Sequence, residues 1–359
     1  MLFSALCAES SKKPLQDIAY LGHDKRIYDD EKAAFKQKLI EPNKSNFHKI
    51  NNKNDKLSEV IFNDFYALLE LWDHADINRI EWIKYLKNYL AFVSCIHVLS
   101  QQKIIIELNS HLKSVFKGKK VDIDRVYQSV SNRHQNLFVP DLVAKNIIDN
   151  HLVDFFRARV EFNLLIAFIE KKLDLDFSKQ QIVMTDQGSK DQIPIDEIFN
   201  HARTIAQNEN YDANQFDIDI TKSCEEFNWF NSPLKGVGKN RREFFYSIRK
   251  SDAHDDGYLL EQKKHGNKII GYVVFPGQNL IELMMIFANS DRNEDKQKLV
   301  LNHLEKKFEC YGINFTQSKK STRNHLILSL QNIGMLKGSP DAQESAELYP
   351  VLSKSKAKL

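Results

Sequence analysis

A long uninterrupted helical pattern is the feature that most constrains the fold of this chain. No glycine and no proline occurs from Glu59 to Phe116. Apolar residues recur in this stretch at three- and four-residue steps, as on one face of an α-helix: Ile80, Ile83, Leu86, Leu90, Val93, Ile96, Leu108, Leu112 and Val115. The pattern predicts at least two long helices, with Ser58 as the N-cap of the first and Asp76 as the N-cap of the second.

A further long helix is predicted from Asp141 to Leu173, because apolar residues again repeat on one face. Its charged residues Asp154, Arg157 and Glu161 have spacings that let them pair along its surface. The first helical stretch also carries aromatic residues at helical spacing, which is typical of packing rather than of a ligand site: Phe62, Phe65, Trp72, Trp82, Tyr85 and Tyr89.

In the second half of the chain the pattern changes. Strand-like pieces at Gln181–Met184 and Phe216–Ile220 flank a helix predicted from Asp196 to Gln207. Turn sequences containing Gly257 and Gly266 then separate three strand candidates, which predict a small antiparallel meander: residues 243–248, 258–262 and 268–275.

The stretch from Pro276 to Leu352 shows a recognisable order of elements. It contains three predicted helices, with a strand-like Tyr311–Phe315 before the third, and then a two-armed ribbon: helices at 280–288, 296–308 and 319–333, and arms at 335–337 and 346–349. Three helices followed by a hairpin is the order of a winged helix. That form both binds DNA and docks proteins, so the order alone leaves the two uses open.

These patterns predict a mainly α protein with a smaller α+β part. The N-terminal part is a long-helix bundle, and the C-terminal part is a winged-helix-like domain preceded by a short antiparallel meander. A length of 359 residues suits two or three domains. The predicted divisions are an arm and linker at 1–56, a helical bundle domain at 57–175, an α+β linker domain with the meander at 176–275, a winged-helix-like domain at 276–352 and a basic tail at 353–359.

Composition narrows the possible classes of function. The formal charge of +3 is small against 51 basic and 48 acidic residues, so nucleic-acid binding requires local patches. The four cysteines form no paired motif, and no histidine cluster or cofactor fingerprint occurs, so we expect no metal, no cofactor and no enzymatic activity. No run approaches the roughly 18 apolar residues that span a membrane, so we expect no membrane contact and a cytoplasmic location.

Two basic segments are candidate DNA contacts. The first is the loop Lys235-Gly236-Val237-Gly238-Lys239-Asn240-Arg241-Arg242. It resembles a phosphate-binding P-loop but lacks the first glycine and the Ser or Thr after the lysine. Two interpretations of its cations Lys235, Lys239, Arg241 and Arg242 stay open: a solvated basic loop, or contacts with a phosphate backbone or an acidic partner. The second is the start of the last helix, which supplies Lys319, Lys320, Arg323 and Asn324.

A minority hypothesis is a metal-dependent nuclease. Glu261 and Lys263 lie two apart on a predicted strand, which puts both side chains on one face, and Asp255 or Asp256 precedes them. An upstream aspartate sharing a metal with Glu261 is the arrangement that restriction-type nucleases require. A hairpin with paired surface charges explains the same residues.

The last predicted helix is less suited to DNA reading than its position suggests. At 100° steps, Leu328 falls in the middle of its polar face, where a major-groove helix usually carries polar or basic side chains. Lysine and arginine number nine between Pro276 and Leu352, as do aspartate and glutamate. Both observations favour a docking platform at least as much as a DNA reader.

The closing motifs resemble the C-terminal end of DptG (DndG) accessory proteins of phosphorothioation-dependent restriction, over roughly the last third of the chain. The motifs are Tyr311-Gly312-Ile313-Asn314-Phe315, Leu330-Gln331-Asn332-Ile333-Gly334-Met335-Leu336 and Gly338-Ser339-Pro340-Asp341-Ala342. The resemblance implies a non-catalytic bacterial subunit of an ATP-driven anti-phage defence complex, with an ATPase among its partners. We therefore expect a DNA-associated or scaffolding subunit, with the nuclease and a protein-only adaptor as alternatives.

Overall fold

The computed structural model describes residues 56–74, 77–132, 134–140, 144–177, 181–183, 192–208, 211–214, 216, 221–222, 249, 257–291, 299–318, 320–337 and 347–349. Eight helices and six short strands lie within these ranges, which confirms a mainly α protein with a smaller β content. The predicted arm up to residue 55, the strand at 243–248 and the basic tail at 353–359 lie outside the described residues.

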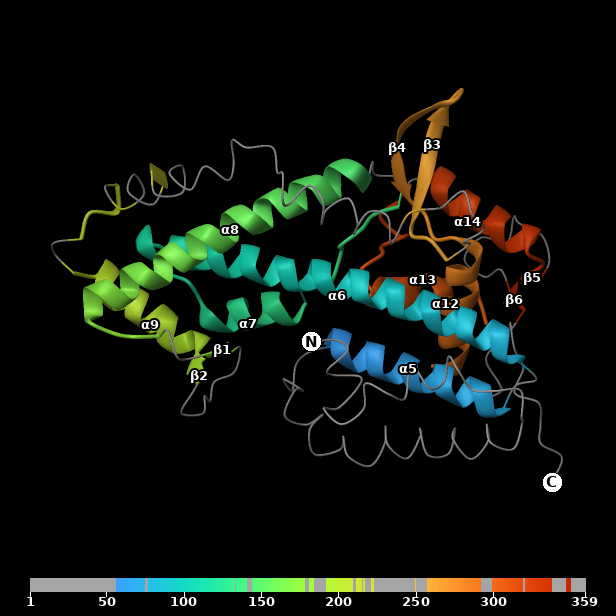
Figure 1. Cartoon of the computed structure of the whole chain (residues 1–359), viewed down its shortest axis with the longest axis horizontal. Coiled ribbons are helices and arrows are strands. Elements are labelled where there is room, and N and C mark those ends of the chain that lie inside the picture. The colour runs from blue at the N-terminus through green and yellow to red at the C-terminus, as the bar shows by residue number, and fades with distance from the viewer. Residues whose placement is uncertain are drawn as a thin grey trace.

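The uninterrupted helical stretch forms two helices, α5 (Lys56–His74) and α6 (Arg79–Phe116). The predicted N-caps are wrong: Ser58 lies inside α5, and the N-cap of α6 is Asn78, whose side chain accepts a hydrogen bond from the Glu81 amide at 2.9 Å. Figure 1 shows α6 running along the long axis of the molecule, with other elements packed at both of its ends.

The next elements cover the second half of α6. The short helix α7 (Ile123–Ser131) follows a brief connection, and α8 (Ala144–Leu173) runs back beside α6. A parallel strand pair, β1 (Gln181–Val183) and β2 (Gln192–Pro194), leads into α9 (Ile195–Ala206), close to the predicted helix from Asp196. A strand was predicted at residues 216–220. Of these residues the structure describes Phe216, whose backbone is helical, so no strand begins there.

The C-terminal elements return to the first half of α6. An antiparallel hairpin of β3 (Leu260–His265) and β4 (Lys268–Val274) turns at Gly266, which has a φ of 58°. It precedes the helices α12 (Gln278–Ser290), α13 (Leu301–Cys310) and α14 (Lys320–Asn332). The last described elements are the antiparallel pair β5 (Leu336–Lys337) and β6 (Glu347–Leu348).

The strand predicted at Tyr311–Phe315 is a turn that makes a single parallel β-bridge, between Ile313 and Phe138. Gly312 explains the difference, because its φ of 81° lies in the left-handed region that favours glycine. A Cβ at this position would lie 1.9 Å from the carbonyl oxygen of His134. The segment therefore serves as a close contact with residues 134–138 rather than as a sheet strand.

Two hydrophobic cores share α6. The larger core joins α5 and the first half of α6, up to Leu99, to α12, α13, α14 and the base of the β3–β4 hairpin. The smaller core begins at Leu108 on α6 and includes α7, α8, α9 and Phe216. Between these two points Ser100 is buried, and residues 101–107 of α6 are half-buried.

The distribution of the cores differs from the predicted domain divisions. The larger core combines residues of the predicted bundle domain at 57–175 with residues of the predicted domain at 276–352. The predictive signals were local in sequence, whereas the packing of α5 against α12 is a long-range contact. By length and composition alone, α6 is apolar enough to cross a membrane; its two halves contribute to the two cores.

Candidate functional site

The α14 helix is held in place by a charged pair beneath it. Arg323 of α14 donates from Nε and Nη2 to the two carboxylate oxygens of Glu305 on α13, at 2.6 and 2.7 Å. Glu305 is buried, so this two-point contact is strong and fixes geometry. Leu326, Ile327 and Leu330 are buried on the same side of the helix. Arg323, predicted as a DNA contact, is thus paired with a buried carboxylate of the protein itself.

A glycine at the end of α14 redirects the chain into the terminal ribbon. Gly334 has a φ of 73°, and the Met335 amide donates to the Leu330 carbonyl at 2.8 Å, which closes the helix in the way glycine C-caps do. The Tyr349 amide then donates to the Met335 carbonyl at 2.9 Å and ties the two arms together. The ribbon therefore lies next to the end of α14.

The outer face of α14 is exposed to solvent. We define it by its exposed residues: Lys320, Ser321, Asn324, His325, Leu328 and Asn332. Leu328 is 52% exposed, and Tyr349 beside β6 is 46% exposed. No acidic residue occurs between Glu309 and Asp341, so this face carries no negative charge of its own. Of the predicted DNA contacts, Lys320 and Asn324 lie on it, and Lys319 lies outside the described residues.

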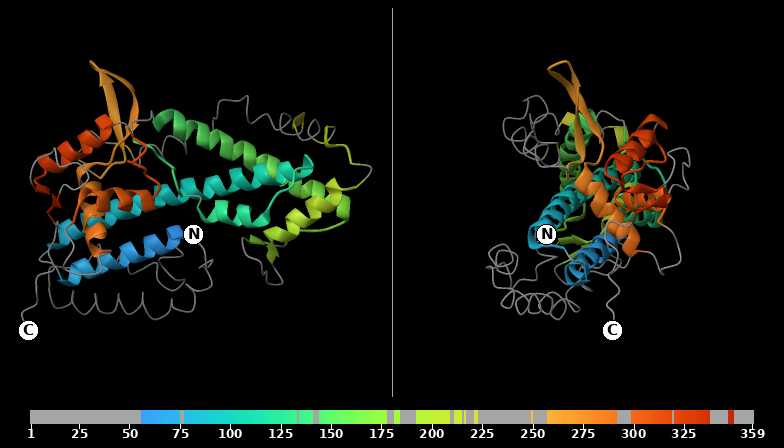
Figure 2. Two further views of the ribbon diagram at one scale, coloured as in Figure 1. Left: turned by 180° about the vertical axis from the view of Figure 1, so that it is seen from behind. Right: turned by 90° about the vertical axis from the view of Figure 1, so that its right-hand side faces the viewer.

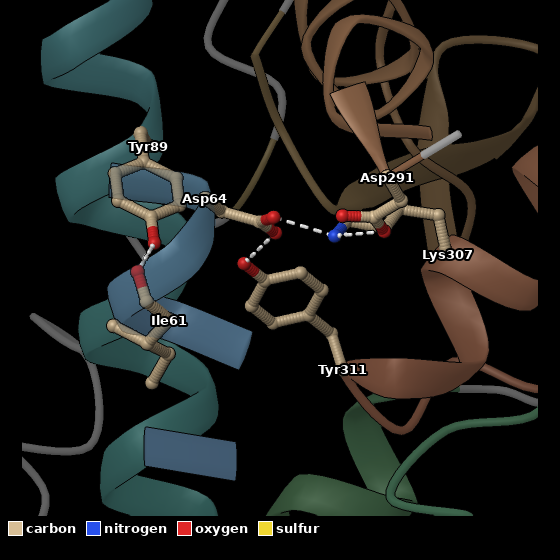
Figure 3. Close-up of polar contacts among 6 residues, drawn as sticks. All are labelled: Ile61, Asp64, Tyr89, Asp291, Lys307 and Tyr311. Carbon is tan, nitrogen blue, oxygen red and sulfur yellow. Dashed lines mark hydrogen bonds and ion pairs between the residues drawn. The ribbon is translucent and has the colours of Figure 1, made fainter. Parts of the chain in front are cut away.

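A buried polar network lies on the opposite side of α13 (Figure 3). The Lys307 ammonium donates to Asp64 of α5 at 2.5 Å and to Asp291, which follows α12, at 2.8 Å. Tyr311 donates its hydroxyl to the second oxygen of Asp64. Close by, the hydroxyl of Tyr89 donates to the Ile61 carbonyl at 2.5 Å. The network thus joins α5 to the end of α12 and to α13.

Burial dominates the electrostatics of this network. It raises the pKa of Asp64 from 3.8 to about 6, although the neighbouring Lys307 opposes the rise. Burial alone would lower the pKa of Lys307, but the charges of Asp64 and Asp291 outweigh it, so that pKa is raised and the ammonium stays charged. The pKa values of Tyr89 and Tyr311 are both raised well above 10, chiefly by burial.

The network is structural in character. Side chains of Asp64 and Lys307 are only 1% and 4% exposed, so a substrate in solution does not reach them. Sequence reasoning missed both residues. A signal was present, because Asp64 interrupts the apolar face of α5 at the spacing of Ile61 and Leu68, and a charge in such a position needs a buried partner.

The residues of the nuclease hypothesis are only partly described. Glu261 is half-buried on β3, Lys263 is exposed on the same strand, and Asp255 and Asp256 lie outside the described residues. Among the described residues no group of three histidine, cysteine, aspartate or glutamate side chains is arranged to hold a metal ion. The basic loop residues Lys235, Lys239, Arg241 and Arg242 also lie outside them, so both hypotheses stay predictions.

A shallow groove lies between α6 and α8, with a volume of about 390 Å³. Lys113, Lys117, Lys119 and Arg157 line it together with Asp154 and Glu161. Glu161 accepts hydrogen bonds from Asn109 Nδ2 at 2.6 Å and from Lys113 Nζ at 3.3 Å, so its carboxylate is already bonded to two of the lining residues. These contacts connect the two helices across the groove.

Comparison with known proteins identifies no relative. No protein-family model, no curated protein and no solved structure matches this chain. The candidate surfaces therefore rest on the chain's own residues and geometry.

Proposed function

We propose that this protein is a non-catalytic subunit of a bacterial anti-phage defence complex, which docks a partner protein through the outer face of α14 and associates with DNA. The observation that carries the docking role is the half-exposed Leu328 in the middle of an acid-free helix face. Protein contacts have an apolar centre and a polar rim, and the polar residues around Leu328 supply such a rim.

A winged-helix-like arrangement supports this proposal. The order α12, α13, α14 and β5–β6 is the one expected from the sequence. In addition, Val300, just before α13, forms an antiparallel bridge with Glu347 of β6. A winged helix pairs a short strand that precedes its second helix with the last arm of its hairpin, so this bridge favours the assignment. In that form the third helix and the hairpin face the ligand.

The choice of a defence complex rests on the resemblance of the closing motifs to DptG-like accessory proteins. That resemblance suggests an ATPase among the partners. The anchoring of Arg323 by Glu305 leaves Lys320 as the described cation of the α14 face, which favours protein docking over base reading there. A protein-only adaptor is the alternative, and it differs in making no DNA contact.

Co-expression with the products of adjacent genes tests the docking role. We expect a stable complex with one of them, and we expect Leu328→Asp to weaken it by more than tenfold, because a charge would enter an apolar contact. Asn302→Asp is the matched control, since Asn302 is exposed on α13 and gains the same charge. Equal binding by the two variants, or no complex of the wild-type protein with any neighbour, would contradict the proposal.

A further inference from the structure

The β3–β4 ribbon projects from the body of the molecule, away from α5 and the lower helices (Figures 1 and 2). Its two strands pair antiparallel from Leu260 with Val274 to His265 with Lys268, with a shift of register between Lys263 and Lys264. Every residue from Lys263 to Lys268 is exposed. The outer half of the ribbon is thus a free, two-stranded projection.

The base of the ribbon is firmly anchored. Leu260 and Val274 are completely buried in the larger core, and β4 packs against α8. The ring of Phe275 stacks on that of His325 at 4.3 Å, so the ribbon is also joined to α14. An anchored base holds the outer half in one direction, which lowers the entropy lost when it binds a ligand.

The outer half of the ribbon is basic on both of its faces. It carries Lys263, Lys264, His265 and Lys268 and no acidic residue. The strand register shifts between Lys263 and Lys264, and beyond this shift side chains alternate, so Lys264 and His265 lie on opposite faces of β3. Lys268 is paired with His265 and shares its face. Cations therefore point away from both sides of the ribbon.

This arrangement fits a DNA groove better than a protein or a membrane. Every residue of the exposed segment Lys263-Lys264-His265-Gly266-Asn267-Lys268 is charged, polar or glycine, and the first apolar residues of the β4 arm, Ile269 and Ile270, follow it. Protein interfaces need an apolar anchor, and so does membrane insertion. Three residues per arm extend about 10 Å, close to the roughly 8.5 Å depth of the major groove, which admits a two-stranded ribbon.

We propose that the β3–β4 ribbon enters the major groove of double-stranded DNA and that Lys263, Lys264 and Lys268 contact the phosphates on its two sides. This inference deepens the DNA-associated part of the proposed function and rests on it. The contacts are to the phosphate backbone, so binding is strongly salt-dependent and only weakly sequence-dependent.

Fluorescence anisotropy with a short labelled duplex, titrated over a range of salt concentrations, tests the proposal. The triple variant Lys263→Ala, Lys264→Ala, Lys268→Ala should bind at least tenfold more weakly at low salt. When the logarithm of its affinity is plotted against the logarithm of the salt concentration, the magnitude of the slope should be smaller than that of the wild type by about 2 to 3. Each lost phosphate contact removes about 0.9 from this slope. A major-groove ligand such as methyl green should displace the wild-type protein, whereas netropsin in the minor groove should not.

The matched control removes the same charge at the far end of the molecule. Lys119→Ala, Lys120→Ala, Lys171→Ala alters three exposed lysines there and should keep most of the wild-type slope. Equal slopes for the two triple variants would overturn the ribbon assignment, as would stronger binding to a single strand than to the duplex. A wild-type protein that binds no DNA at low salt would overturn it too. In each of these cases the docking role of α14 is still decided separately by the Leu328→Asp experiment.

Discussion

The two cores along α6 are built in different ways. Among the described residues, the buried Asp, Glu and Lys side chains all belong to the larger core region: Asp64, Glu305 and Lys307. In the smaller core, aromatic rings pack against the ring of Phe116 instead. The larger core joins segments 243 residues apart, whereas the smaller one forms among consecutive elements. We infer that in the larger core these directional charge pairs specify which distant surfaces meet.

Removing one partner of the buried pair should have the largest effect. We expect Lys307→Met to lower the free energy of unfolding by about 3 to 5 kcal/mol, because the Asp64 carboxyl is left buried without its cation. Urea unfolding measures this loss. The double variant Asp64→Asn, Lys307→Met should lose less than Lys307→Met alone. The exposed neighbour Lys306 is the control, and a Lys306→Met variant that loses as much would refute the role of the pair.

A substitution in the smaller core should lower the free energy of unfolding by a smaller amount, and this amount should not depend on pH. Phe116→Leu removes ring contacts with Phe168, Tyr211 and Phe216, whose centroids lie 5.7, 6.1 and 4.6 Å away. The expected cost is about 2 kcal/mol, again measured by urea unfolding. Combining it with Lys307→Met tests the independence of the cores, because losses at distant sites add. A total well below the sum would show that the two cores unfold as one coupled unit.

Much of the fold could be predicted because its signals are local. The periodicity that predicted α5, α6 and α8 depends on residues three and four apart, and each helix lies close to its expected place. The turn at Gly266 and the hairpin around it were also predictable from short-range chemistry.

The remaining features depend on contacts between distant residues. Nothing near Tyr311 or Gly312 shows that this segment packs against residues 134–138, which is why a strand was expected there. Arg323 looks like a free cation in the sequence, and only the fold shows Glu305 beneath it. Asp64 could be recognised as an oddity on an apolar face, but its partner Lys307 could not.

The pH dependence of stability should distinguish the two cores. Asp64 titrates near pH 6 when folded and near its ordinary 3.8 when unfolded, so the folded state binds this proton more tightly. Its contribution to the free energy of unfolding therefore increases as the pH falls through the folded pKa. When the pH is lowered from about 7 to about 5, the free energy of unfolding of the wild type should increase by on the order of 1 kcal/mol relative to that of Asp64→Asn. The difference between wild type and Phe116→Leu should stay constant, and a parallel shift in both comparisons would contradict the Asp64 assignment.

The smallest effect is expected for a charge pair outside the larger core. Lys337 and Glu347 join β5 to β6 at 3.2 Å, but their side chains are 39% and 27% exposed. Water and salt screen such a pair, so Glu347→Gln should change the free energy of unfolding by less than about 1 kcal/mol. Urea unfolding at low and high salt measures it, with wild type as the reference. If Glu347→Gln lowered the free energy of unfolding as much as Lys307→Met does, pairing itself, and not burial, would set the strength of these contacts. The contrast between the two cores would then need another cause.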